Sequence, residues 1–209
     1  METAAVVLAG GRSARMGRDK AGLTLDGEDF LARLTARFRE RFDRVYVSGP
    51  GGLPDLRPGE GPLAGLESAF FHTGAERIFV TAVDLPFADP VLARLLLDGL
   101  GERDACLIRR RSGRVEPLFA AYRRTCLPQV QACLEEGRRA MGALLDRLDC
   151  RVVEERDLPG FDLDRLLLNV NTPADYRRAE KISNSSLQQC FSVVTYDSNQ
   201  DITGLEECT

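Results

Sequence analysis

The chain has 209 residues, of which 44% are hydrophobic and 29% are charged. This length suits one ordinary globular domain with a substantial core, and the composition excludes a chain that is disordered throughout. The formal net charge of -4 gives no reason to expect nonspecific binding to nucleic acid, because such domains carry a marked basic excess. No apolar run reaches the roughly 18 residues of a membrane span. The apolar stretch from Ala4 to Ala9 lacks the basic start and the length of a signal peptide, so we expect a cytoplasmic protein without a membrane partner.

Short apolar runs alternate with segments of helical period along the first 180 residues. The runs at residues 4–9, 44–48 and 77–83 predict strands, and each is apolar on both faces as in the centre of a parallel sheet. Between the first two runs, phenylalanine or leucine recurs every four residues from Phe30 to Phe42, which predicts a helix packed on the sheet. Asp89 and Pro90 are typical of the start of another helix. The alternation predicts the α/β class, with a mainly parallel central sheet flanked by helices.

The second half of the chain predicts smaller elements. Residues 105–109 and 116–122 form a predicted hairpin, followed by short helices at 127–134 and 140–148 and a strand at 150–154. Thr172, Pro173 and Asp175 predict the start of a last helix. From Lys181 onward there is no arginine and much Ser, Asn and Gln. We therefore divide the chain into a domain at 1–180 and a compositionally distinct tail at 181–209, which we interpret as a disordered or an appended segment. Within this tail, residues 191–196 have the composition of a strand.

The strongest functional signal is the run LAGGRSARMGRDK, from Leu8 to Lys20. A buried strand ends here in paired glycines, and ligands of parallel α/β sheets bind outside the carboxyl ends of the strands. Glycines let backbone N–H groups approach an anion, and the run adds four cations within nine residues: Arg12, Arg15, Arg18 and Lys20. The run contains neither GxxxxGK[ST] nor GxGxxG. We interpret it as a cradle for a triphosphate.

Two further positions follow predicted strands. The loop GPLAG, Gly61 to Gly65, opens a predicted helix, and its small residues let a flat base or ribose lie against the backbone. Asp84 follows the third apolar run; such an acid is often structural, but beside a phosphate cradle it favours binding of a hard cation. His72 is the only histidine and is interpreted as a packing or surface residue, and the six cysteines contain no CxxC pair of the kind found in zinc sites.

Six segments resemble the molybdenum cofactor guanylyltransferase family. They are LAGGRSARMGRDK, GPLAGL, VDLPF at Val83, EPLFAAY at Glu116, GRRAM at Gly137 and NVNTPADY at Asn169, and they span essentially all of the first 180 residues in the family's order. The resemblance implies a single Rossmann-like nucleotidyltransferase domain. It also implies roles for individual residues: nucleotide contacts by Leu8, Ala9, Gly10, Gly11 and Asp55, phosphate binding and catalysis by Arg15 and Lys20, magnesium binding and catalysis by Asp84, and contacts to the pterin cofactor by Arg139, Asn169 and Asn171. Where the family often has asparagine near the end of the second strand, this chain has Ser48.

The reaction that the resemblance implies is the transfer of GMP from GTP to the molybdopterin cofactor, with release of pyrophosphate. A molybdoenzyme or a cofactor-delivery protein is the expected macromolecular partner. Two other activities stay open: another nucleotidyl transfer, with CTP and the same pterin or with a sugar phosphate, and delivery of the cofactor by a nucleotide-binding chaperone without catalysis. The residues alone do not separate GTP from CTP, because a backbone loop that reads guanine resembles one that reads cytosine.

Overall fold

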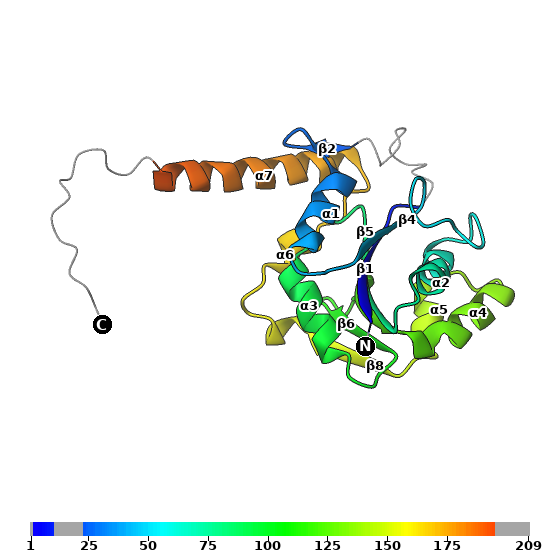
Figure 1. Cartoon of the computed structure of the whole chain (residues 1–209). Coiled ribbons are helices and arrows are strands. Elements are labelled where there is room, and N and C mark those ends of the chain that lie inside the picture. Colours follow the sequence, from blue (N-terminus) through cyan, green and yellow to red (C-terminus); the bar gives the residue numbers. More distant parts are fainter. Residues whose placement is uncertain (1, 11–22, 195–209) are drawn as a thin grey trace, which may run out of the picture.

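The structure is a computed structural model that describes residues 2–10 and 23–194, with the backbone alone described for residues 186–194. Its central sheet has six strands, and only one of them, β7, runs antiparallel to its neighbours. The expected α/β class with a mainly parallel sheet is therefore confirmed (Figure 1). In spatial order the strands are β4 (Val45–Ser48), β1 (Thr3–Leu8), β5 (Arg77–Ala82), β7 (Val115–Arg123), β6 (Ala105–Arg109) and β8 (Cys150–Glu154).

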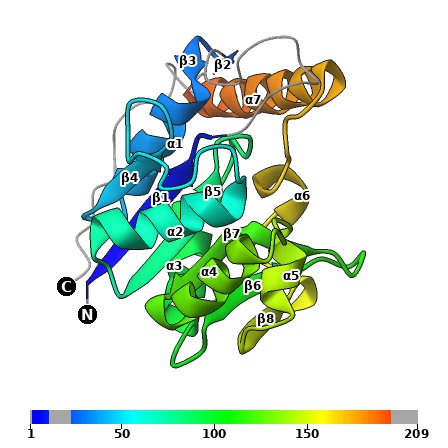
Figure 2. The same ribbon diagram turned by 90° about the vertical axis from the view of Figure 1, so that its right-hand side faces the viewer.

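Helices cover both faces of this sheet, and each face has its own hydrophobic core (Figures 1 and 2). Apolar side chains of β1 and β5 alternate between the two cores, as the period of a strand requires: Val7 and Phe79 face one, Val6 and Val80 the other. The first core is closed by α1 (Phe30–Arg39), α3 (Pro90–Gly99), α6 (Leu163–Leu166) and α7 (Pro173–Val194), and the second by α2 (Pro62–Thr73), α4 (Leu127–Glu135) and α5 (Met141–Leu145).

The predicted helix starts rest on side-chain caps. Asp29 accepts hydrogen bonds from the backbone N–H groups of Leu31 (2.8 Å) and Ala32 (3.0 Å) at the start of α1. Asp89 does the same at the start of α3, where Pro90 takes the first position. These bonds satisfy N–H groups that have no partner within the helix, which confirms the predicted cap at Asp89 and adds one at Asp29 that the sequence analysis did not predict.

One small element was missed by the sequence analysis. β2 (Thr24–Leu25) and β3 (Glu28–Asp29) form a two-stranded hairpin ahead of α1. Its turn has positive φ at Asp26 (55°) and Gly27 (80°). An Asp-Gly pair is a strong signal for this kind of turn, so the dipeptide could have indicated the hairpin.

The last helix differs from the sequence expectation. Residues 191–194, expected in a strand, belong to α7; residues 195 and 196 lie outside the described part of the chain. A helix that is already nucleated extends at little cost, which outweighs the weak strand preference of a short β-branched run. The helix also passes without interruption through residue 181, and Ile182 and Ser183 pack against the domain, with the Ser183 hydroxyl bonded to Asp26. None of the described helices is long and apolar enough to span a membrane.

Candidate functional site

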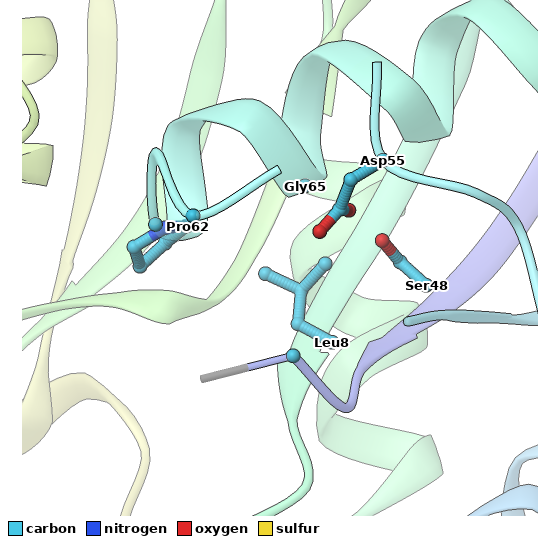
Figure 3. A pocket seen from close by; sticks show the side chains of 8 residues that line it. Leu8, Ser48, Asp55, Pro62 and Gly65 are labelled. Carbon is cyan, nitrogen blue, oxygen red and sulfur yellow. The ribbon is translucent and has the colours of Figure 1, made fainter. Parts of the chain in front are cut away.

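A small pocket lies where β1 and β4 end and α2 begins (Figure 3). Leu8 and Ser48 are the last residues of these two neighbouring strands and are paired in register. The backbone N–H of Ala9 donates to the Ser48 carbonyl at 2.8 Å, so the two chains leave the sheet together. The pocket has a volume of about 100 Å³ and is lined by Leu8, Gly10, Ser48, Asp55, Gly59, Gly61, Pro62 and Gly65.

Glycines make room for this pocket. Gly49 has φ of 134°, and a Cβ atom there would lie 3.1 Å from the backbone nitrogen of Gly10, so only glycine lets β4 turn this close to the end of β1. A Cβ atom on Gly65 would lie 3.0 Å from Leu8 Cδ2 and 3.6 Å from Ser48 Oγ. Gly61 begins α2 with φ of 78° and is followed by Pro62 at the first helical position. The predicted GPLAG loop therefore forms one wall of the pocket.

Asp55 is the only charged side chain among the described residues of the lining. Figure 3 shows its carboxylate directed toward the region between Ser48 and Leu8. A Cβ atom on Gly10 would lie 3.9 Å from Asp55 Oδ2, which places the carboxylate across the pocket from the exit of β1. The structure thus brings together four elements of the sequence prediction: Leu8, Gly10, the GPLAG loop and Asp55.

Asp84 and the two predicted asparagines meet at the end of β5. The backbone N–H of Val170 donates to the Asp84 carbonyl at 2.8 Å, which holds the segment Asn169–Asn171 beside that acid. The Asn171 amide donates to the Asn169 side-chain oxygen. Asp84, Asn169 and Asn171 are each partly exposed as residues, while the Oδ1 atom of Asp84 is buried.

The helix that follows the asparagines begins with a capping box. The Asp175 carboxylate accepts from the backbone N–H and the hydroxyl of Thr172, both at 2.8 Å, and the Thr172 hydroxyl accepts from the N–H of Asp175 at 3.2 Å. The Thr172 hydroxyl is the main cause that holds the pKa of Asp175 below its ordinary value. The box fixes the start of α7 and, through an N–H bond of 3.2 Å to Asp175, the backbone of Asn171.

Arg139 lies next to the pocket loop, away from the two asparagines. Its guanidinium binds both carboxylate oxygens of Glu60, with 2.9 Å between Nη2 and Oε1. This hydrogen bonding lowers the pKa of Glu60 and raises the pKa of Arg139. Glu60 stands between two pocket glycines, Gly59 and Gly61, so the pair ties the turn before α5 to the pocket loop. Among the described contacts, those of Arg139 are with Glu60 and Gly137 and not with the asparagines.

The remaining residues of the predicted phosphate cradle lie outside the described part of the chain: Gly11, Arg12, Arg15, Arg18 and Lys20. The described chain resumes at Leu23, whose carbonyl accepts from the N–H of Phe30 at 3.1 Å. Gly10, the last described residue before this segment, lines the pocket, and Leu23, the first one after it, is bonded to the start of α1.

The EPLFAAY segment lies within β7, and its first residue, Glu116, is close to Arg110 and Arg114. Glu116 is buried, which raises the pKa of its carboxyl, while nearby Arg114 and Arg110 oppose the shift. Arg114 Nη2 lies 3.3 Å from Glu116, and Arg110 binds Glu155 at 2.9 Å. The Tyr122 hydroxyl donates to the Pro117 carbonyl at 2.8 Å. This segment thus stiffens the middle of the sheet beside the end of β5.

The described cysteines are structural thiols. Cys106, Cys126, Cys133 and Cys150 are all free, and burial raises the pKa of Cys106 to about 11. The described residues contain no cluster of three or more His, Cys, Asp or Glu side chains that could hold a metal ion by themselves.

Three residues to which the sequence analysis assigned no role lie at the pocket or contact its loop: Ser48, Glu60 and His72. Ser48 lines the pocket, Glu60 binds Arg139, and His72 contacts the loop that carries Asp55. The sequence offers a weak signal for Ser48, which ends a predicted strand. The other two depend on contacts between distant segments.

Comparisons with known proteins agree with this geometry. Residues 5–152 match the family model described as the MobA-like NTP transferase domain. A protein of Pelotomaculum thermopropionicum named probable molybdenum cofactor guanylyltransferase is 31% identical over 89% of this chain and 96% of its own length. The molybdenum cofactor guanylyltransferase of Rhizobium meliloti is 32% identical over 84% of this chain and 89% of its own.

The solved structures include a close match in fold. The molybdopterin-guanine dinucleotide biosynthesis protein A of Archaeoglobus fulgidus superimposes with a TM-score of 0.71 at 24% identity, over 87% of this chain and 98% of its own. The fold, the motif order and the matched length agree, and the chain belongs to the MobA-like NTP transferase family.

Proposed function

We propose that this protein transfers GMP from GTP to the molybdopterin cofactor, forming the guanine dinucleotide cofactor and pyrophosphate. The observation that carries the proposal is the pocket at the ends of β1 and β4, where Leu8, Gly10, Asp55 and the GPLAG loop meet. These are the segments in which the chain resembles guanylyltransferases, and two such relatives are more than 30% identical over most of its length.

The pocket supports binding of guanine through its one carboxylate. Guanine presents two adjacent N–H donors on one edge, and an ionised carboxylate accepts two hydrogen bonds side by side. Asp55 is directed into the pocket in a position to provide these acceptors. Backbone groups from Leu8 to Gly11 would contact the nucleotide, and Arg15 and Lys20 would bind its phosphates.

Asp84 fits a magnesium ion that is shared with the substrate. Mg²⁺ commonly takes one or two protein carboxylates and completes its shell with phosphate oxygens and water. The Asp84 carboxylate, which follows the end of β5, supports a site of this type. When bound there, the ion would supply charge neutralisation for the triphosphate.

The asparagines and Arg139 would receive the acceptor. Amides offer both donors and acceptors to a pterin ring, and a guanidinium binds a phosphate. Asn169 and Asn171 lie beside Asp84, and Arg139 is bound to Glu60 of the pocket loop, so the acceptor would span the edge between β5 and α2. A molybdoenzyme or a cofactor-delivery protein would then take up the product.

The reaction requires no covalent protein intermediate. A phosphate oxygen of the acceptor attacks the α-phosphorus of GTP, a new P–O bond forms, and the bond to the bridging oxygen of pyrophosphate breaks with its electron pair. The protein's own contribution is to hold donor and acceptor phosphates close together and to neutralise their charge with Arg15, Lys20 and Arg139. This explains why cations and an acid suffice, without a nucleophile and base pair.

The test is pyrophosphate release by the purified protein with each of the four nucleoside triphosphates and magnesium, with either the molybdopterin cofactor or a sugar phosphate as the acceptor. GTP is expected to give the fastest release and the largest rise in thermal midpoint. A ligand at a hundredfold excess over its Kd stabilises the native state by about 2.7 kcal/mol, which is readily measured. Faster release with CTP would identify a cytidylyl transfer, release only with a sugar phosphate would identify that acceptor, and binding without release would indicate a chaperone.

A further inference from the structure

We propose that one face of α2 holds Asp55 in its nucleotide-binding position, with Ser68 and His72 as positioning residues. The inference rests on the proposed nucleotide pocket and concerns two residues for which the family resemblance implies no role. Both lie on the helix that begins with the GPLAG loop, and neither lines the pocket itself.

Two hydrogen bonds fix the backbone directly on either side of Asp55. His72 Nε2 lies 3.0 Å from the carbonyl oxygen of Pro54 and donates to it. The backbone N–H of Leu56 donates to the Ser68 hydroxyl at 2.9 Å. The residues before and after Asp55 are therefore both tied to α2, while the Asp55 side chain is left to face the pocket (Figure 3).

The spacing of residues along α2 explains how one helix both lines the pocket and holds the Asp55 loop. Gly65, Ser68 and His72 are three and four residues apart, so they lie along the same face of the helix. Gly65 lines the pocket, and the next two residues on this face hold the loop that closes it. The pocket wall and the support of Asp55 are thus parts of one rigid element.

The Ser68 hydroxyl is both a hydrogen-bond donor and a hydrogen-bond acceptor in this arrangement. It donates to the Ala64 carbonyl at 2.7 Å and accepts from the Leu56 N–H. Because Ser68 is fully buried, the donor on Leu56 has no water to replace the hydroxyl if it is removed.

An ion pair anchors the same loop one residue further on. Arg57 Nε lies 3.0 Å from Glu67 Oε2, and Nη2 lies 3.4 Å from the other oxygen of the same carboxylate. The Glu67 side chain is only 5% exposed, so the loop covers a charge that would otherwise be costly to bury. Three residues of α2 therefore hold this loop: Glu67 anchors Arg57, while Ser68 and His72 bind the backbone groups on either side of Asp55.

The physical consequence is preorganisation. Residues 54–57 lie outside any helix or named strand, so without these bonds the Asp55 backbone would sample several conformations. A ligand that needs one of them would lose affinity in proportion to the fraction of molecules in the competent state. Ser68 and His72 therefore raise nucleotide affinity through Asp55 without touching the nucleotide.

The experiment is a double-mutant cycle read by calorimetric titration of GTP. Ser68→Ala and His72→Leu are made alone and together with Asp55→Asn, and thermal unfolding is recorded for every protein. Ser68→Ala and His72→Leu each remove one hydrogen bond to the loop, and each should weaken GTP binding about three- to tenfold, the usual range for one hydrogen bond. In the Asp55→Asn background the same changes should alter the Kd by less than about twofold, because the group they position is already gone.

Two controls separate positioning from general stability. Thr73→Val removes a hydroxyl of the same helix that donates to the Ala69 carbonyl at 2.7 Å and lies away from the Asp55 loop; it should lower the thermal midpoint but leave GTP affinity unchanged. His72→Gln retains a donor near Nε2 and should restore most of the affinity lost in His72→Leu.

The outcomes are distinct for the two proposals. If the wild-type protein binds another nucleotide and not GTP, the proposed function is wrong, and the cycle is carried out with the nucleotide that binds. If the wild type binds a nucleotide and the effects of Ser68→Ala and His72→Leu are equal with and without Asp55, the positioning role is overturned. Unchanged nucleotide affinity in folded Ser68→Ala and His72→Leu proteins overturns it as well.

Discussion

Replacement of Gly65 by alanine should separate ligand binding from stability at the proposed nucleotide pocket. The new Cβ atom would lie 3.0 Å from Leu8 Cδ2 and 3.6 Å from Ser48 Oγ, in a pocket of about 100 Å³. Leu8 Cδ2 is the end of a flexible side chain, so it can move by a few tenths of an ångström. Both the methyl group and the displaced Leu8 side chain would then occupy space in the pocket.

The two effects have opposite signs. Alanine is favoured over glycine within a helix by about 1 kcal/mol, and the shift of Leu8 offsets part of that gain, so the free energy of unfolding should stay within about 1 kcal/mol of the wild type. In a pocket this small, a new methyl group and a displaced Leu8 side chain remove space that the ligand would need. We expect the Kd for GTP to rise at least about tenfold, equivalent to about 1.4 kcal/mol.

The assay pairs calorimetric titration of GTP with urea unfolding. Gly142→Ala is the matched control, because Gly142 also lies in a helix and a Cβ atom there would meet nothing within 4 Å. The control should bind GTP like the wild type. A folded Gly65→Ala protein with wild-type GTP affinity would refute the assignment of this pocket to the nucleotide.

Three further predictions concern the edge of the sheet and the last helix. Asp84→Asn keeps the side-chain volume but removes the charge, so single-turnover transfer at saturating GTP should fall about 100-fold or more; a near-normal rate with unchanged magnesium dependence would contradict the metal role. Asn171→Asp places a negative charge beside Asn169 and should weaken acceptor binding in calorimetry while GTP binding is retained; equal losses for both ligands would indicate a role in the fold alone. A chain that ends after Glu180 lacks Ile182 and Ser183, which pack on the domain, and should have a lower thermal midpoint than a chain that ends after Val194; equal midpoints would show that these contacts add nothing.

The capping box predicts a pH dependence. Because the pKa of Asp175 is lowered in the folded state, its stabilising effect is present above the unfolded pKa and is lost as pH falls through the folded pKa. Asp175→Ala should cost about 1 kcal/mol in urea unfolding at neutral pH, and the difference from the wild type should vanish in acid. A difference that persists at acidic pH would mean that the carboxylate charge is not its cause.

Much of the fold was readable because it depends on local patterns. The apolar runs of β1 and β5, the four-residue repeat of phenylalanine and leucine in α1, and the capping residue Asp89 act over a few neighbouring positions. The same is true of the glycines at the end of β1 and in the GPLAG loop, where a special backbone conformation or close approach is needed. Patterns of this kind predicted the α/β class, which the structure confirms, and the segments that meet at the proposed nucleotide pocket.

The tertiary structure alone decided how distant segments meet. The hairpin was predicted, but its second strand inserts between β5 and β6 and becomes the one antiparallel strand of the sheet. The pairing of Glu60 with Arg139, the support of the Asp55 loop by Ser68 and His72, and the bond from Val170 to Asp84 likewise join segments that no periodicity relates. Such contacts follow from the packing of whole elements, because a side chain's sequence position specifies its own helix or strand face but not which other segment the core brings against it.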